Sequence, residues 1–166
     1  MIRLGMINDL ESIMDVIKEA QTRMKHDGLT QWQNGYPNRE IIIEDLHNKN
    51  LYVCELEGKI IATMSVFPYD SIYDDIEGKW LNNDPYMAVH RIAISDMYVG
   101  KGINQKMLNF IFDHFNVRNI RIDTHPSNTR MIRSLEKQGF KACGTVHVLT
   151  DEDSLRIAYH KTLHLK

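Results

Sequence analysis

Gly100 and Gly102 lie between an apolar run and a periodic segment, and their types and spacing suit a turn that binds an anion. Residues 89–94 read as a strand, and after the glycines apolar residues recur with the 3.6-residue period of a helix. The periodic residues are Met107, Leu108, Ile111, Phe112 and Phe115. The first turn of a helix offers backbone N–H groups without intrahelical acceptors, together with the positive end of the helix dipole. Because glycine has no Cβ atom to hold a phosphate away, the sequence predicts a pyrophosphate site here.

Two common phosphate-binding patterns do not fit this turn. A Walker loop has four residues between its glycines and Lys-Ser/Thr after them, whereas a single residue, Lys101, separates these two glycines. A dinucleotide-binding loop has a third glycine at the position that Gln105 occupies. The turn therefore belongs to neither class.

The residues around the turn resemble the acetyl-coenzyme A motif of the GNAT N-acetyltransferases, which is Gln/Arg-x-x-Gly-x-Gly/Ala after a strand. In this chain the motif reads Met97-Tyr98-Val99-Gly100-Lys101-Gly102. Met97 stands where the family has Gln or Arg. This departure weakens the match only a little, because such a loop binds its phosphates mostly through main-chain atoms.

A second block, residues 128–140, is similar to the family's Asn-x-x-Ala-x-x-Leu-Tyr-x-x-x-Gly-Phe. The positions that match are Asn128, Leu135, Gly139 and Phe140. Met131 and Glu136 replace the family's Ala and Tyr. Because two independent blocks occur in the right order and spacing, the whole chain is identified as a member of the family. Other short sequence segments resemble a bacterial subgroup of the family whose substrates are mostly unassigned.

The resemblance implies acetyl transfer from acetyl-CoA, as cosubstrate and without a metal, to a primary amine of a small molecule or peptide. The amine would attack the thioester directly in a ternary complex. The strand backbone would hold the pantetheine arm, the glycine turn would surround the pyrophosphate, and the second block would contact the arm from the other side. The implied cofactor-binding residues are Ile92, Ala93, Ile94, Val99, Gly100, Lys101, Gly102, Ile103, Asn104, Asn128 and Met131.

Two histidines are candidates for the base that a protonated amine requires before it can attack. His90 shares a strand face with Ile92 and Ile94 if side chains alternate along the strand. It also matches a catalytic histidine position of the arylalkylamine N-acetyltransferases; the alternative is a hydrogen-bonded core histidine. His125 is the second candidate, and its alternative is a brace for the loop before Pro126.

The family's usual acid is a tyrosine at the position of Glu136, which we expect to face solvent. Tyr98 and Tyr159 are open alternatives for the acid, although a coenzyme A thiolate can also leave unaided. The missing tyrosine supports a second hypothesis for function, an acetyl-CoA-binding module that acts as a sensor or regulator without efficient catalysis. A third, phosphate or nucleotide sensing by the turn alone, predicts tight ATP binding.

Four large aromatic residues are candidates for the walls of an acceptor pocket, and the alternative is that they cap the core. These predicted substrate-binding residues are Trp32, Tyr36, Trp80 and Tyr86. The acidic segment at residues 69–85 has two interpretations as well, a solvated loop or a rim that attracts a cationic amine.

The elements that position these residues follow from periodicity and turn signals. Strands are expected at residues 2–4, 51–56, 59–67, 89–94, 119–124, 140–149 and 155–163, and helices at 8–25, 38–47, 103–115 and 128–138. Asn8 is the expected cap of the first helix, with Glu11 as its capping-box partner. This order predicts one α/β (α+β) domain over residues 1–166. The resemblance adds the GNAT fold, with a mixed, mostly antiparallel central sheet and helices on both faces.

The composition is that of an ordinary globular chain, with 43% hydrophobic and 25% charged residues. A formal net charge of -2 argues against nucleic-acid binding, and no apolar run approaches the ~18 residues that span a membrane. The two cysteines, Cys54 and Cys143, are expected to be buried free thiols in a reducing cytoplasm, and no Cys/His cluster has zinc spacing. Many members of the family pair as homodimers, so a homodimer and a monomer are both kept as alternatives.

Overall fold

The computed structural model describes residues 1–164, and over this range it contains eight strands and four α-helices. The strands are β1 (Ile2–Leu4), β2 (Leu51–Leu56), β3 (Lys59–Phe67), β4 (Glu77–Gly78), β5 (Met87–Ile94), β6 (Asn119–Thr124), β7 (Lys141–His147) and β8 (Leu155–Thr162). The helices are α1 (Leu10–His26), α2 (Arg39–His47), α3 (Ile103–Phe115) and α4 (Thr129–Lys137). Apart from β4 and short 3-10 turns, this order is the predicted one.

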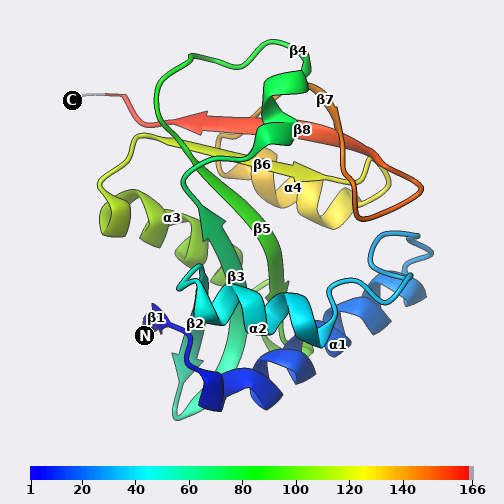
Figure 1. The fold of residues 1–166 in the computed structure, drawn as a ribbon, viewed down its shortest axis with the longest axis vertical. Coiled ribbons are helices and arrows are strands. Elements are labelled where there is room, and N and C mark those ends of the chain that lie inside the picture. The colour runs from blue at the N-terminus through cyan, green and yellow to red at the C-terminus, as the bar shows by residue number, and fades with distance from the viewer. Residues whose placement is uncertain (165–166) are drawn as a thin grey trace. The chain divides into compact units, whose positions relative to one another are not determined.

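Hydrogen bonding orders the strands β1-β2-β3-β5-β6-β8-β7-β4 (Figure 1). β5 pairs with β6 in parallel, whereas β1–β2, β2–β3, β6–β8, β7–β8 and β4–β7 are antiparallel. The predicted mixed, mostly antiparallel sheet is therefore confirmed.

The chain forms two compact units, which are described separately. Unit 1 comprises Met1–Val66 and His90–Met107, and unit 2 comprises Phe67–Val89 and Leu108–Lys166. β5 and α3 thus contribute to both units.

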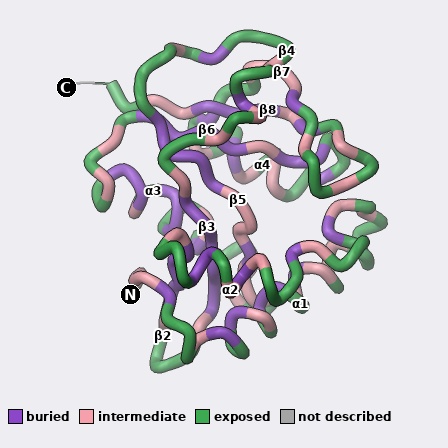
Figure 2. Tube along the Cα trace, viewed as in Figure 1, coloured by how far each residue is buried: buried purple, intermediate pink, exposed green. Residues whose placement is uncertain are grey.

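In unit 1, α1 and α2 lie beside each other and pack on the strands (Figure 1). α1 buries one face because its apolar residues recur at three- and four-residue intervals, and Ile13 and Ile17 are wholly inaccessible to solvent. Burying each such side chain contributes about 2 kcal/mol. β3 is buried over residues 61–66, which Figure 2 shows as a continuous buried trace. Unit 1 therefore has a core of its own, between α1, α2 and the strands.

The predicted cap of the first helix is wrong. A 3-10 turn at Ile7–Asp9 precedes α1. The capping side chain of this turn is Asp9 and not Asn8, because the Asp9 carboxylate accepts the Met6 N–H at 2.8 Å. Arg3 of β1 binds the same carboxylate at 2.8 Å. This hydrogen-bonded ion pair lowers the pKa of Asp9. The Arg3 contact joins two elements, so the local capping pattern alone did not reveal it.

In unit 2, β6 is buried on both faces, because Ile120 and Ile122 alternate with the buried polar residues Asn119 and Arg121. A second core cluster gathers Tyr73, Trp80, Tyr86, Ala88, Val146 and Ala158. The segment at residues 69–85 is less irregular than predicted, because it contains a 3-10 turn at Ser71–Asp75 and the short β4. Tyr73 and Trp80 hold this segment to the core, and the Trp80 indole N–H donates to the Tyr73 carbonyl at 2.9 Å.

Candidate active site

The predicted phosphate turn has the backbone that its glycines suggest. Gly100 and Gly102 have φ angles of +76° and +78°, which a side chain would strain, and a Cβ atom built at either would meet no atom within 4 Å. Lys106 N–H donates to the Gly102 carbonyl at 3.1 Å, so α3 starts directly after the second glycine. The amides of the first helical turn have no intrahelical acceptor. A turn with open space beside both glycines, followed by the free amides of a helix start, is suited to bind a diphosphate.

Two polar residues of α1 fix the junction between β5 and this turn. The Glu19 carboxylate accepts the Ser95 hydroxyl at 2.8 Å and the Asp96 N–H at 2.7 Å. Arg23 donates to the Ile94 carbonyl at 3.1 Å and pairs with Asp96. Sequence reasoning treated α1 as core packing only and missed both residues, although their four-residue separation places them on one helix face.

β5 is not a regular strand in the region expected to hold the pantetheine arm. Arg91 has a φ of +52°, and burial changes from uniform at residues 87–89 to mixed at residues 90–94 (Figure 2). Strict alternation of side chains requires extended backbone throughout. The argument that His90 and Ile92 share a face by alternation is therefore wrong, and His90 remains a candidate only by its motif position.

Arg91 belongs to a buried polar network inside unit 1. Its Nε and Nη2 atoms donate to the Asp45 carboxylate at 2.7 and 2.9 Å, and the Ser65 hydroxyl donates to the same carboxylate at 2.5 Å. Its Nη1 atom donates to the Tyr36 hydroxyl oxygen at 2.8 Å. Burial opposes the charge of Arg91, but its interactions with Tyr36 and Asp45 outweigh burial and raise the pKa of Arg91. Asp45 was missed because it sits on an α2 face that otherwise reads as apolar.

The four predicted pocket aromatics fall into two pairs, one in each unit. In unit 1, Trp32 is buried and its ring lies edge-on to Tyr36, with centroids 6.5 Å apart. In unit 2, Trp80 and Tyr86 are buried and enclose the Arg121 guanidinium, whose carbon lies 4.2 and 4.1 Å from their ring centroids. Trp32, Trp80 and Tyr86 all belong to core clusters, and Tyr36 packs against the cluster that contains Trp32. This packing supports the alternative that the aromatics cap the core, and the pocket role of all four stays a prediction.

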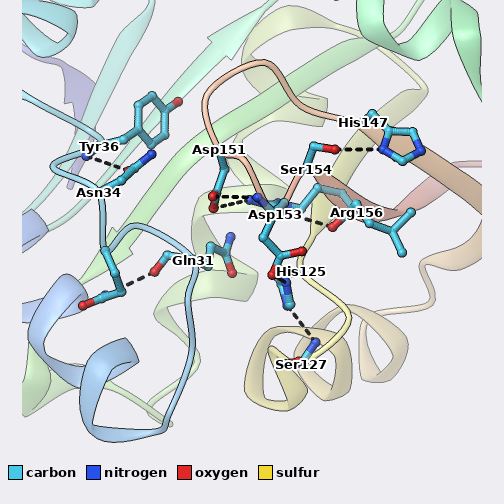
Figure 3. Close-up of polar contacts among 12 residues, drawn as sticks. Gln31, Asn34, Tyr36, His125, Ser127, His147, Asp151, Asp153, Ser154 and Arg156 are labelled. Carbon is cyan, nitrogen blue, oxygen red and sulfur yellow. Dashed lines mark hydrogen bonds and ion pairs between the residues drawn. The ribbon is translucent and has the colours of Figure 1, made fainter.

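His125 uses both ring nitrogens within unit 2 (Figure 3). Its Nδ1 accepts the Ser127 N–H at 3.0 Å, and its Nε2 lies 2.7 Å from an Asp153 carboxylate oxygen. Nδ1 must therefore lack a proton and Nε2 must carry one. Arg156 donates to the Asp153 carbonyl at 2.6 Å, so His125 is part of a brace for the β7–β8 loop. This geometry supports the loop-brace alternative over a catalytic base.

The second motif block starts as predicted. Asn128 caps α4, because its side-chain oxygen accepts the Met131 N–H at 3.2 Å, and Gly139 ends the helix with a φ of +87°. Glu136, at the position of the family's acid, is exposed, as predicted. Tyr159 is buried, which raises its pKa. In α4 the position of the family's acid is therefore an exposed carboxylate and not a tyrosine.

Two further findings concern other kinds of site. Within residues 1–164, no three His, Cys, Asp or Glu side chains come together in a way that could hold a metal ion. None of the helices described over this range combines the length and apolar character needed to cross a bilayer.

Comparisons with known proteins agree with the geometry. The profile of the Acetyltransferase (GNAT) family matches residues 11–140. A GNAT acetyltransferase from Streptococcus agalactiae 2603 is 35% identical, with 99% of this chain and 96% of that chain covered and a TM-score of 0.91. For a putative acetyltransferase from Staphylococcus aureus MU50 the identity is 28%, both chains are covered to 99%, and the TM-score is 0.72. The comparison with curated proteins gave no match.

A GNAT acetyltransferase from Listeria monocytogenes 4b F2365, at 22% identity, has the same fold, with a TM-score of 0.74 over 98% of this chain and 94% of that chain. The profile match covers both sequence blocks and the glycine turn, and the first of these structures is similar over nearly its whole length. From these findings, the chain belongs to the GNAT acetyltransferase family, whose members are acyltransferases that use acetyl-CoA and act on amines.

Proposed function

We propose that residues 1–166 form a single GNAT domain that transfers the acetyl group of acetyl-CoA to a primary amine of a small molecule or peptide. The observation that carries the proposal is the turn at Gly100 and Gly102, which opens into space at the start of α3. Both glycines adopt positive φ angles that favour glycine, so the sequence is compatible with this turn shape.

In this reaction the backbone of residues 92–94 would hold the pantetheine arm, and residues 99–104 would surround the diphosphate. Asn128 and Met131 at the start of α4 would contact the arm. Acetyl-CoA supplies the activated acyl group, and the protein supplies orientation and proton transfer. His90 is proposed as the base that removes a proton from the amine.

The alternative is an acetyl-CoA-binding module without efficient catalysis. Exposed Glu136, in the place of the usual tyrosine, favours it. The two functions differ in one measurable respect, because both predict binding of acetyl-CoA but only the enzyme releases free thiol when an amine is present.

The test combines calorimetric titration of acetyl-CoA with an assay for free thiol over a panel of amines. The panel should hold polyamines, arylalkylamines, aminoglycosides and peptides with free N-termini. Binding with amine-dependent thiol release supports the enzyme. Binding without release from any amine favours the module, and absence of binding contradicts both.

Gly102→Val should abolish measurable binding of acetyl-CoA, because its branched side chain would project into the space proposed for the diphosphate. Gly58→Val is the matched control, since Gly58 has a φ of +76° and also has no atom within 4 Å of a built Cβ. Both substitutions carry a similar backbone strain of about 1–2 kcal/mol. Equal loss of affinity in both variants, or normal affinity in Gly102→Val, would count against a diphosphate at this turn.

A cytoplasmic location and a homodimer stay predictions. The net charge of -2 gives no reason to expect a nucleic-acid partner.

A further inference from the structure

Tyr36 is held in place from several directions within unit 1. Its ring packs edge-on against buried Trp32, and its backbone carbonyl accepts the Gln21 amide at 3.0 Å. Its backbone N–H donates to the Asn34 side chain at 3.3 Å (Figure 3). Its hydroxyl is fixed as well, because the Tyr36 oxygen accepts a hydrogen bond from Arg91 Nη1 at 2.8 Å.

The contact with Arg91 determines how the hydroxyl is oriented. A guanidinium can only donate hydrogen bonds, so the Tyr36 oxygen contributes a lone pair and its hydrogen is directed away from Arg91. Arg91 keeps its charge because Asp45 and Ser65 complete the network behind it. A fixed cation beside a phenol oxygen stabilises the phenolate that remains after the proton has left.

Two other tyrosines of this chain have a carboxylate, and not a guanidinium, beside the hydroxyl. Tyr69 donates to the Asp74 carboxylate, and this hydrogen bond raises the pKa of Tyr69 to about 12. Tyr73 donates to the Asp123 carboxylate at 2.7 Å, and burial together with that charge raises the pKa of Tyr73 well above its ordinary value. Proton loss is opposed at both hydroxyls, whereas at Tyr36 the neighbouring charge favours it.

Arg91 also connects Tyr36 to β5, the strand that is proposed to hold the pantetheine arm. It lies in β5 between His90 and Ile92, next to residues 92–94, which are proposed to hold the pantetheine arm. The guanidinium at the end of its side chain is the group that contacts the phenol oxygen. With Glu136 exposed on α4, any proton donor for the leaving sulfur would come from elsewhere in the chain.

We propose that Tyr36 is that proton donor, a catalytic residue whose phenolate is stabilised by Arg91 acting as a positioning residue. This inference rests on the proposed acetyl-transfer function. The amine lone pair forms the C–N bond, the C–S bond breaks with its electron pair moving to sulfur, and the Tyr36 proton forms the S–H bond. The phenolate then recovers a proton, through solvent, from the newly acetylated nitrogen, so that amine and thioester give amide and thiol.

The test is Tyr36→Phe, which keeps the ring packing on Trp32 and removes only the hydroxyl. Tyr52→Phe is the matched control, because it removes a hydroxyl from another buried tyrosine of unit 1. We expect kcat to fall about 10²-fold in Tyr36→Phe, with an unchanged KM for acetyl-CoA and loss of the solvent deuterium isotope effect on kcat. Tyr52→Phe should match the wild type in all three quantities.

A raised KM for the amine with an unchanged kcat would overturn the proposal, since Tyr36 would then only line the acceptor pocket. A second variant covers the case in which Tyr36→Phe is poorly folded. Tyr36→3-fluorotyrosine keeps the shape of the side chain and makes the phenol more acidic, so the alkaline limb of the kcat profile should move to lower pH. An unmoved limb contradicts a proton donor at Tyr36.

These outcomes are separate from a failure of the proposed function. If the wild type binds acetyl-CoA but acetylates no amine, the transferase assignment fails, and the Tyr36 proposal fails with it. If the wild type turns over and Tyr36→Phe turns over equally well, only the Tyr36 proposal is lost.

Discussion

Single hydrogen bonds decide which titratable side chains remain candidates for proton transfer. His125 was a possible base by sequence, but both of its nitrogens are engaged by Ser127 and Asp153. Taking up a proton at Nδ1 would break the Ser127 contact. His90 is half-buried beside the bend at Arg91 and is the histidine that we propose as the base.

His90→Gln should lower kcat about 10²-fold and remove the acidic limb of its pH profile, because glutamine cannot take a proton from the amine. Steady-state rates between pH 5.5 and 9 measure this, and His26→Gln, at an exposed position of α1, is the control. If the acidic limb persists at the wild-type position, His90 has no part in the proton transfer.

Among the elements, α1 and α2 determine the shape of β5 and of the turn that follows it. Glu19 and Arg23 of α1 bind the end of β5, and Asp45 of α2 binds Arg91 in its middle. A residue with positive φ inside a strand is costly unless its surroundings hold it. The bend in β5 is therefore stabilised by a carboxylate that approaches from a helix.

Asp45→Asn should lower the free energy of unfolding by about 3–5 kcal/mol, because it leaves the buried Arg91 guanidinium without its anion. Urea denaturation measures the change. The control is Glu11→Gln, which breaks the exposed ion pair with Arg39 and should leave the urea midpoint unchanged. Equal midpoints for both variants would show that the Asp45–Arg91 pair does not hold unit 1 together.

The same elements show where sequence reasoning succeeds. Helices and strands with a clear period, such as α1, α3 and β3, were predicted within a residue or two, because local pattern and burial agree there. The glycine turn and the start of α4 near Asn128 were also predicted, since their signals lie in adjacent residues.

Features that depend on distant partners were not predictable. The bend at Arg91 needs Asp45, which is 46 positions away in the chain, and the role of Asp9 needs Arg3 from β1. The brace on His125 comes from Asp153, and a local pattern gives no sign of it. Sequence therefore located the candidate site in the chain but not the side chains that support it.

For the molecule as a whole, His160 should make stability depend on pH. It is wholly buried in unit 2, where Nδ1 accepts the Leu81 N–H at 3.2 Å and Nε2 lies 2.9 Å from the Asn119 side-chain oxygen. Both contacts fit the neutral ring, and burial together with the nearby Arg121 charge lowers the pKa of His160 to about 4.

Between pH 6.5 and 4 the unfolded chain binds a proton at this position and the folded chain does not, so stability should fall as pH falls. The loss attributable to His160 is about 3 kcal/mol when complete, and it should be absent above pH 7. Urea denaturation at pH 7.5, 6 and 5 measures it. His160→Gln should flatten the dependence, whereas His147→Gln, at an exposed position, should not. An identical slope in the wild type and His160→Gln would contradict this role.

The central claim is that the backbone of residues 99–104 binds the diphosphate of acetyl-CoA. A crystal structure of the wild-type protein grown in excess acetyl-CoA tests it most directly. We predict diphosphate oxygens within hydrogen-bonding distance of the amides between Gly100 and Asn104, with the thioester beside residues 92–94. A turn that holds no diphosphate under these conditions, or a cofactor bound elsewhere on the chain, would contradict the claim.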